Sequence, residues 1–296
     1  MRRVLYVGVA VCLLVSLALP VMAQMTPSGD PPKVMQIYRE TVKPGKGFAY
    51  ESLAANFVQA FQRANSPSHW VTLNSISGAN EVWYMVGYQS FAEWEAEQNV
   101  NMQSAVLLAS MKQLEPASSD LVDSSNSIVV VYRPELSHGV SSVSVPHARF
   151  VRTTVLRIRL GTEPVFIERT KEAKAAHDKA NTGVHWFTYQ VVSGMPAGTY
   201  VLFATMKSMS EADVDTGKAF QDALGEEGYS KRLQFARDNI IVVNSNLYAF
   251  NPKTSRPTQE WVAANPDFWK VKTGAQVAGR KTSSKSVPAT TKQPQQ

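Results

Sequence analysis

The sequence predicts an α+β protein made of two consecutive β-α-β-β-α-β units, and three observations support this. Residues 42–78 align without a gap with residues 158–194, an offset of 116 positions, and nine of the 37 aligned positions are identical. After a two-residue insertion the offset becomes 118 and pairs Ser90 with Ser208 and Glu93 with Glu211. The hydrophobic period also changes in the same order in both halves. Together these observations predict a duplicated unit.

The first half of each unit reads as a strand followed by a helix. Residues 34–42 and 150–158 are rich in β-branched and aromatic side chains and precede a glycine turn, as first strands do. Apolar positions then recur at steps of four and three, which places them on one helix face. They are Tyr50, Ala54, Phe57, Phe61 and Ala64, and Phe166, Thr170, Ala173, His177 and Ala180. Asn65 and Asn181 stand where these helices should end.

The second half of each unit reads as two strands, a helix and a last strand. Second strands begin at His69 and His185, and third strands cover residues 82–88 and 200–206. Ser90 and Ser208, each with a glutamate three positions on, predict capped second helices that run through about residues 114 and 235. Last strands are expected over residues 128–132 and part of 240–250. We therefore expect units at 33–136 and 147–253, with a docking segment at 254–269 that carries Trp261 and Trp269.

This order is the ferredoxin-like arrangement, in which both helices cover one face of a four-stranded sheet. An open second face needs a cover, and a second copy of the unit is the simplest one. On element order and duplication, residues 33–253 resemble the dimeric α/β-barrel superfamily in its tandem form. The resemblance implies two units that pair sheet to sheet as a pseudo-dimeric barrel. That superfamily includes cofactor-free monooxygenases, haem-degrading enzymes and chlorite dismutase-like haem proteins, so the resemblance leaves the function open.

The two ends of the chain predict its compartment. Arg2 and Arg3, an apolar run over residues 4–19 and the sequence Val21-Met22-Ala23 are typical of a signal peptide cleaved after Ala23. We expect a periplasmic or secreted protein with no membrane insertion after cleavage. Cys12 is the only cysteine, so the mature chain would have no disulfide, thiolate metal site or cysteine nucleophile.

The basic charge of the chain is concentrated in its last residues. Residues 270–296 carry six basic and no acidic side chains and have the composition of a disordered tail. Residues 24–269 hold 22 basic and 24 acidic side chains. The charge therefore indicates no nucleic-acid partner. The oligomeric state is left open.

The second strands carry the candidate ligand site, because local nucleotide, zinc-protease and hydrolase motifs are absent from the sequence. Alternation places a more apolar set on one face, from His69 and His185 onward, and we expect that set to face the helices. The other face would then line a cleft between the sheets that binds a small, partly apolar ligand. Its candidate ligand-binding residues are Trp70, Thr72, Asn74, Trp186, Thr188 and Gln190. The alternative is that these residues fill the interface and pair with one another.

The remaining candidates are histidines and glutamates. His69 and His185 occupy equivalent positions in separate units, which predicts a structural role and no metal site. A solvated helix start is expected for the glutamates at 93, 95 and 97. His177 replaces Phe61 on its helix, and resemblance to the chlorite dismutase-like proteins implies an axial haem ligand there. Its helix is expected on the side away from the cleft, so we expect no cofactor. Haem belongs to an oxidoreductase alternative, beside a cofactor-free oxidoreductase and a non-catalytic partner-binding protein. The catalytic residues, if any, are unknown.

Overall fold

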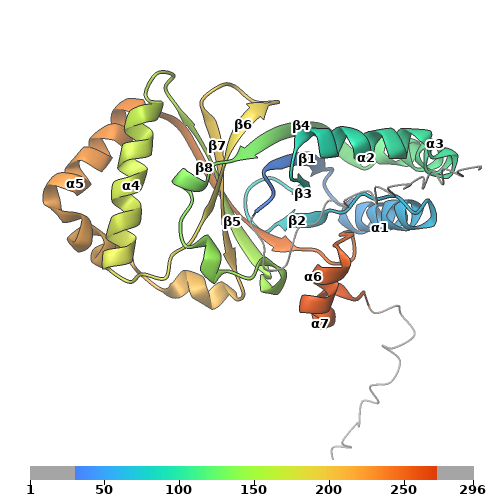
Figure 1. The fold of residues 1–296 in the computed structure, drawn as a ribbon. Helices are drawn as coiled ribbons and strands as arrows, with labels where there is room; N and C mark the ends of the chain where they lie inside the picture. The colour runs from blue at the N-terminus through green and yellow to red at the C-terminus, as the bar shows by residue number, and fades with distance from the viewer. Residues whose placement is uncertain (1–30, 272–296) are drawn as a thin grey trace, which may run out of the picture.

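Eight antiparallel strands close into one barrel in the computed structural model, which describes residues 31–271 (Figure 1). The strands are β1 Val34–Val42, β2 Val71–Ser75, β3 Glu81–Tyr88, β4 Val122–Tyr132, β5 Phe150–Ile158, β6 Phe187–Ser193, β7 Thr199–Met206 and β8 Ile240–Phe250. Their order around the barrel is β1-β3-β2-β8-β5-β7-β6-β4. The predicted signal peptide, and the basic tail from residue 272, lie outside the described residues.

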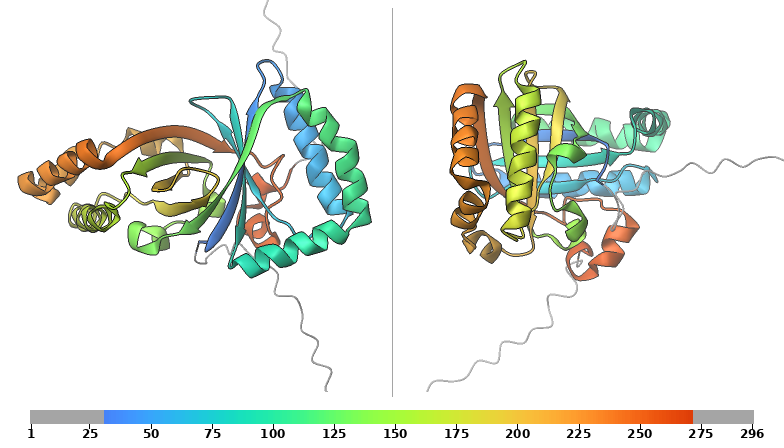
Figure 2. Two further views of the ribbon diagram at one scale, coloured as in Figure 1. Left: turned by 90° about the horizontal axis from the view of Figure 1, so that it is seen from above. Right: turned by 60° about the vertical axis from the view of Figure 1, so that its left-hand side comes forward.

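Helices cover the outside of the barrel in two groups. The first unit contributes α1 Gly47–Arg63, α2 Phe91–Gln103 and α3 Ala105–Ser119, and the second contributes α4 Glu163–Lys179 and α5 Gly217–Asn239. The two groups lie on opposite sides of the barrel (Figures 1 and 2). Short helices are α6 Gln259–Ala264 and α7 Pro266–Trp269, and 3-10 turns are η1 Pro134–Leu136, η2 Val140–Ser142, η3 Val145–His147 and η4 Met209–Asp213. No helix within residues 31–271 has the length and apolarity needed to cross a bilayer.

The predicted fold class is confirmed, because each half contributes one four-stranded sheet of ferredoxin-like order. The orders are β4-β1-β3-β2 and β8-β5-β7-β6, and the sheets join through the pairs β2–β8 and β4–β6. Strands β1 and β5 have identical lengths at the offset of 116, as β3 and β7, and β4 and β8, have at 118. Asn65 and Asn181 end their helices with φ of 48° and 46°, the left-handed conformation that asparagine tolerates.

Some element boundaries differ from the predictions. Both last strands are longer, since β4 begins at Val122 and β8 covers the whole of Ile240–Phe250. In the first unit Ser104 divides the second helix into α2 and α3 and caps the latter. In the second unit Ser208 precedes the 3-10 turn η4, and the long helix begins only at Gly217. Serine caps a helical turn in each case, but the local pattern does not specify how long the turn continues.

A reciprocal clamp ties the two units together at the segments that follow their last strands. The backbone of Trp70 exchanges hydrogen bonds with Arg256, and that of Trp186 exchanges them with His138. Both indoles donate to a carbonyl oxygen of the other unit, at 2.8 Å for Trp70 to Thr254 and 2.7 Å for Trp186 to Leu136. These contacts repeat at the offsets of 116 and 118, so the duplication includes the segments that join the units.

The main core fills the barrel. Its buried members include Met35, Ile37, Val71, Leu73, Trp83, Phe187, Tyr189 and Val201. Trp261 and Trp269 belong to the same core, at 2% and 3% exposure, and the indole of Trp269 donates to the carbonyl of Pro146 at 2.8 Å. Helices α6 and α7 therefore pack against the barrel through buried tryptophans.

Candidate functional site

The face assignment of the second strands is wrong. Val71 and Leu73 of β2, with Phe187 and Tyr189 of β6, point into the barrel and belong to its core. Trp70 instead packs with Phe61 of α1, at 5.1 Å between ring centroids, on the helix side of the sheet. The barrel interior is enclosed by strands on every side, so the more apolar set gains most by lying there. The mixed set lies under the helices.

Polar groups of the mixed set find partners in the clamp. The hydroxyls of Thr72 and Thr188 donate to carbonyl oxygens at 3.0 and 2.9 Å. The side-chain oxygen of Gln190 accepts from Arg133, and Asn74 pairs through its backbone with Val82 and Ala249. This bonding matches the structural alternative for these groups. A ligand-binding role for them stays a prediction.

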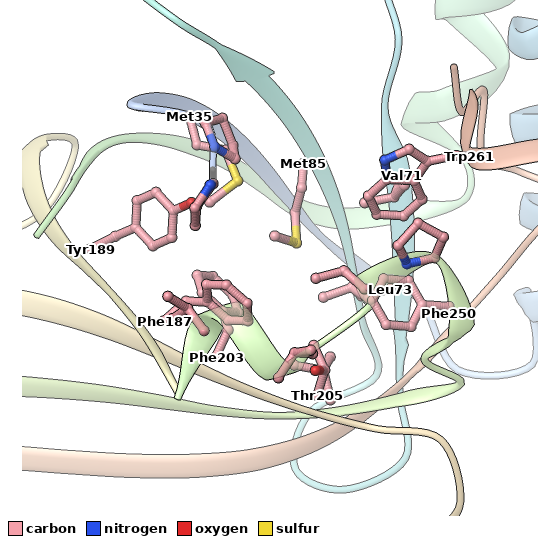
Figure 3. A pocket seen from close by; sticks show the side chains of 17 residues that line it. Met35, Val71, Leu73, Met85, Phe187, Tyr189, Phe203, Thr205, Phe250 and Trp261 are labelled. Carbon is pink, nitrogen blue, oxygen red and sulfur yellow. The ribbon is translucent and has the colours of Figure 1, made fainter. Parts of the chain in front are cut away.

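The space between the sheets contains a small apolar cavity of about 90 Å³ (Figure 3). Side chains from both units point into it, among them Met35, Leu73, Met85, Phe187 and Phe203, and Trp261 lies at one side. Ligand pockets for drug-sized molecules usually measure 300–1,000 Å³. This cavity suits only a very small apolar molecule.

Two larger cavities lie on the helix side of each sheet, with volumes of about 520 Å³ in the first unit and about 500 Å³ in the second. Twelve pairs of lining residues correspond at the offsets of the duplication. They are Gln36/Arg152, Tyr38/Thr154, Glu40/Leu156, Tyr50/Phe166, Leu53/Arg169, Ala54/Thr170, Phe57/Ala173, Phe61/His177, Ser68/Val184, Trp70/Trp186, Tyr84/Leu202 and Val86/Ala204. The two cavities are therefore one ancestral position present twice.

The two cavities carry opposite charge. The first, here the acidic cavity, is lined by Glu40, Glu97 and Glu115 with four tyrosines, and its walls contain no lysine, arginine or histidine from the described chain. The second, here the basic cavity, is lined by Arg152, Arg169, Arg232, His177 and His185, and no aspartate or glutamate of residues 31–271 lines it. Duplication preserved the shape of the site, whereas its chemistry diverged.

The polar wall of the acidic cavity is hydrogen-bonded from within. The hydroxyl of Tyr50 donates to Glu40 and lies 2.7 Å from the hydroxyl of Tyr84. Glu97 accepts from Ser68 at 2.7 Å and from Tyr88 at 2.9 Å. Burial raises the pKa values of Tyr50, Tyr84 and Tyr88, so these groups stay protonated and neutral.

Glu97 corrects the prediction of a solvated helix start. Its side chain is buried, at 8% exposure, and burial raises its pKa. Glu93 does take part in the predicted capping box, since its backbone N–H donates to Ser90 Oγ at 3.1 Å and its carboxylate accepts from the backbone of Gln89. The sequence pattern around Ser90 could not show that Glu97 meets Ser68 of another element.

His177 lies in the basic cavity beside the mixed face. Its ring stacks on Phe220 with centroids 4.4 Å apart and lies 5.5 Å from Trp186. Its Nδ1 pairs with Thr182 Oγ1 at 3.0 Å. Burial, with the nearby His138 and Arg232, lowers the pKa of His177 to about 4, so the imidazole is neutral at pH 7.

This position removes the geometric argument against haem, because it depended on a face assignment that was wrong. The other two histidines hold structural contacts: His69 Nδ1 lies 3.2 Å from the carbonyl oxygen of Arg256, and His185 Nε2 lies 3.1 Å from Thr205 Oγ1. Within residues 31–271 no group of three or more histidine, cysteine, aspartate or glutamate side chains has the arrangement of a metal site.

Comparison with known proteins defines the class through the fold. No family model and no curated protein matches the sequence. An anthrone oxidase-like protein of known structure shares the fold with a TM-score of 0.50 at 12% identity, over 76% of this chain and 93% of the other.

Two further solved structures have the same arrangement at lower similarity. A putative monooxygenase from Lactobacillus acidophilus gives a TM-score of 0.47 at 6% identity, over 78% of this chain and 97% of the other. A mutant chlorite dismutase from Candidatus Nitrospira defluvii gives 0.46 at 8% identity, over 76% and 94%. The chain has the dimeric α/β-barrel fold in tandem form, and no family within that superfamily is assigned.

Proposed function

We propose that the protein binds a small anion with an apolar body in the basic cavity. The observation that carries this proposal is the cavity of about 500 Å³ whose charged lining is entirely basic. Apolar walls come from Leu156, Phe166, Leu202 and Phe235. A pocket of this size, mostly apolar with a few polar groups, is the usual form of a small-ligand site.

The arginines of the cavity differ in how far they are already paired. Arg169 forms ion pairs with Glu168 at 2.9 Å and Glu172 at 2.7 Å on its own helix. Within residues 31–271 neither Arg152 nor Arg232 forms an ion pair, and the guanidinium of Arg232 lies 5.6 Å from the ring centroid of Phe220. These two guanidinium groups are the ones available to an anionic ligand.

The test is a calorimetric titration with 3-phenylpropionate, an anion with an aromatic body. We expect saturable binding that weakens at least tenfold, an order-of-magnitude figure for losing charge-assisted hydrogen bonds, in Arg152→Gln with Arg232→Gln. Glutamine at 152 is the residue of the first unit, so the backbone accommodates it. Arg237→Gln on the same helix α5 is the control, since Arg237 does not line the cavity. Equal affinity in the double variant and the wild type would contradict the proposal.

A haem-dependent oxidoreductase is the second candidate, and His177 is the observation that favours it. The imidazole is neutral, its Nδ1 is held by Thr182, and it shares a cavity with apolar walls and arginines. An axial ligand with its other nitrogen hydrogen-bonded, and cations for carboxylate side groups, are what such a group requires. When bound, haem would supply the redox chemistry. The proteins described as monooxygenase and chlorite dismutase bring an oxidoreductase to mind, but their similarity to this chain is in the fold.

The second candidate predicts a sharp Soret band on titration with haem, at one haem per chain. His177→Phe should weaken that binding by on the order of 100-fold or more, because it removes the axial ligand. Phenylalanine stands at the equivalent position 61, so the variant keeps the packing against Phe220. The exposed His147, changed to alanine, is the control. If the Soret region shows no saturable change, the second candidate fails and a cofactor-free ligand remains.

A further inference from the structure

We propose that the acidic cavity is a second binding site, and that it takes a protonated amine with an apolar or aromatic body. The inference stands apart from the proposed function, because it concerns the other unit and the opposite charge. Its volume of about 520 Å³ equals that of ordinary small-ligand pockets. Three kinds of observation carry it: an unpartnered acceptor, an excess of carboxylates and aromatic walls.

The unpartnered acceptor is Gln36 of β1. Its side chain lines the cavity and is 8% exposed, and its Oε1 is buried with no hydrogen-bond partner among the described residues. Its amide is hydrogen-bonded with Tyr38. Buried acceptors are normally satisfied. A ligand that brings an N–H donor would satisfy this one.

The carboxylates face no compensating cation in the cavity wall. Glu40 accepts one hydrogen bond from Tyr50, and Glu97 accepts from Ser68 and Tyr88, all neutral donors. Glu115 of α3 is exposed and completes the wall. A buried carboxylate surrounded by neutral donors favours a positively charged partner.

Arg256 is the cation nearest to Glu97, and it is engaged elsewhere. Its guanidinium donates to the carbonyl oxygens of Ser66 and Ser68 as part of the clamp. It does not line the cavity. Its positive charge lowers the pKa of Glu97 only against the larger opposing effect of burial. The cavity therefore keeps its negative character.

Comparison of the two units shows that the fold does not require these acceptors. The positions of Glu40, Tyr84 and Tyr88 hold Leu156, Leu202 and Met206 in the second unit, and those apolar side chains occupy the same strands. Packing between helices and sheet is thus possible without carboxylates or phenols. Their presence in one unit alone points to a ligand.

Aromatic walls suit an ammonium group and the body attached to it. Phe57, Phe61, Trp70 and Tyr84 line the cavity from α1, β2 and β3. The faces of aromatic rings attract cations, most strongly when water is excluded. The same rings provide apolar area for an alkyl or aryl body. Together with the acceptors, they define an amine rather than an inorganic cation.

The test uses 3-phenylpropylammonium, the cationic counterpart of the anion chosen for the basic cavity, in calorimetry on the full chain without amine buffers. We expect saturable binding that Glu40→Gln weakens at least tenfold, about the effect of losing one charge-assisted hydrogen bond. Gln36→Leu should weaken binding of the primary amine but not of its trimethylammonium analogue, which has no N–H to donate. Arg152→Gln, which alters the basic cavity, should leave the affinity within twofold.

The inference is overturned if the amine shows no saturable binding, or if Glu40→Gln and Arg152→Gln weaken it equally. Near-ultraviolet circular dichroism of each variant establishes that the fold is retained, and the isosteric Glu40→Gln keeps an acceptor for Tyr50. The two sites can fail separately, since the anion reports on the basic cavity and the amine on the acidic cavity.

Discussion

Replacing Trp83 with alanine is expected to lower the free energy of unfolding by about 3–5 kcal/mol, as for other fully buried aromatic side chains. Trp83 is 1% exposed in the barrel core. Its ring lies 5.2 Å from that of Tyr248 and 6.5 Å from that of Phe203, so it contacts the second unit from the first. Its loss leaves a void where the two sheets meet.

The same substitution also disrupts a charged network inside the barrel. The indole of Trp83 donates to Glu81 at 2.9 Å, and the guanidinium of Arg39 lies 4.7 Å over its ring. Burial raises the pKa of Glu81, but hydrogen bonds from Trp83, Arg39 and Tyr248 outweigh it and lower the pKa. Urea unfolding measures the effect, with Phe48→Ala, at 91% exposure, as a control within about 0.5 kcal/mol of wild type. A loss below about 1 kcal/mol for Trp83→Ala would show that this core is not packed as described.

Replacing Gly194 with alanine is expected to destabilise the protein by about 3 kcal/mol, because the new methyl group would meet backbone atoms. Gly194 has φ of 88°, and an added Cβ would lie 2.2 Å from the carbonyl oxygen of Ser127 and 3.0 Å from the Cα of Ile128. Both atoms belong to β4. Relief of the clash would move β4 at the seam where it pairs with β6.

Two other glycines separate the clash from the backbone penalty. Gly45 has φ of 76° with nothing within 4 Å of an added Cβ, so alanine there should cost only about 1 kcal/mol. Gly78, the counterpart of Gly194, would meet the side chain of Asn246, which can rotate away, and an intermediate loss is expected. Thermal and urea unfolding of the three variants test this order. Equal losses for Gly194→Ala and Gly45→Ala would refute the close approach at the seam.

The sequence alone was sufficient to predict the duplication and the order of the elements. Both signals are local or periodic: repeated residues at constant offsets, strand and helix periods, glycine turns, and asparagines that end helices in the left-handed conformation. The fold class followed from them, because a ferredoxin-like sheet leaves one face to be covered. The proposed cleavage after Ala23 is also a local pattern and stays a prediction.

Tertiary structure decided which face of each strand lies inside. A period of two defines two faces of a strand but not their direction, and a closed barrel buries its interior more completely than helices bury its outside. Trp70 and Trp186 therefore lie under the helices, while Val71 and Phe187 lie in the core.

The candidate sites depended on tertiary structure for the same reason. Glu40, Tyr50 and Tyr84 are separated in the sequence and belong to a strand, a helix and another strand, and only the fold brings them to one wall. The opposite charges of the two cavities could be read from aligned residues once those walls were known. Chain periodicity records how each segment alternates, whereas the chemistry of a cavity arises from segments that meet across it.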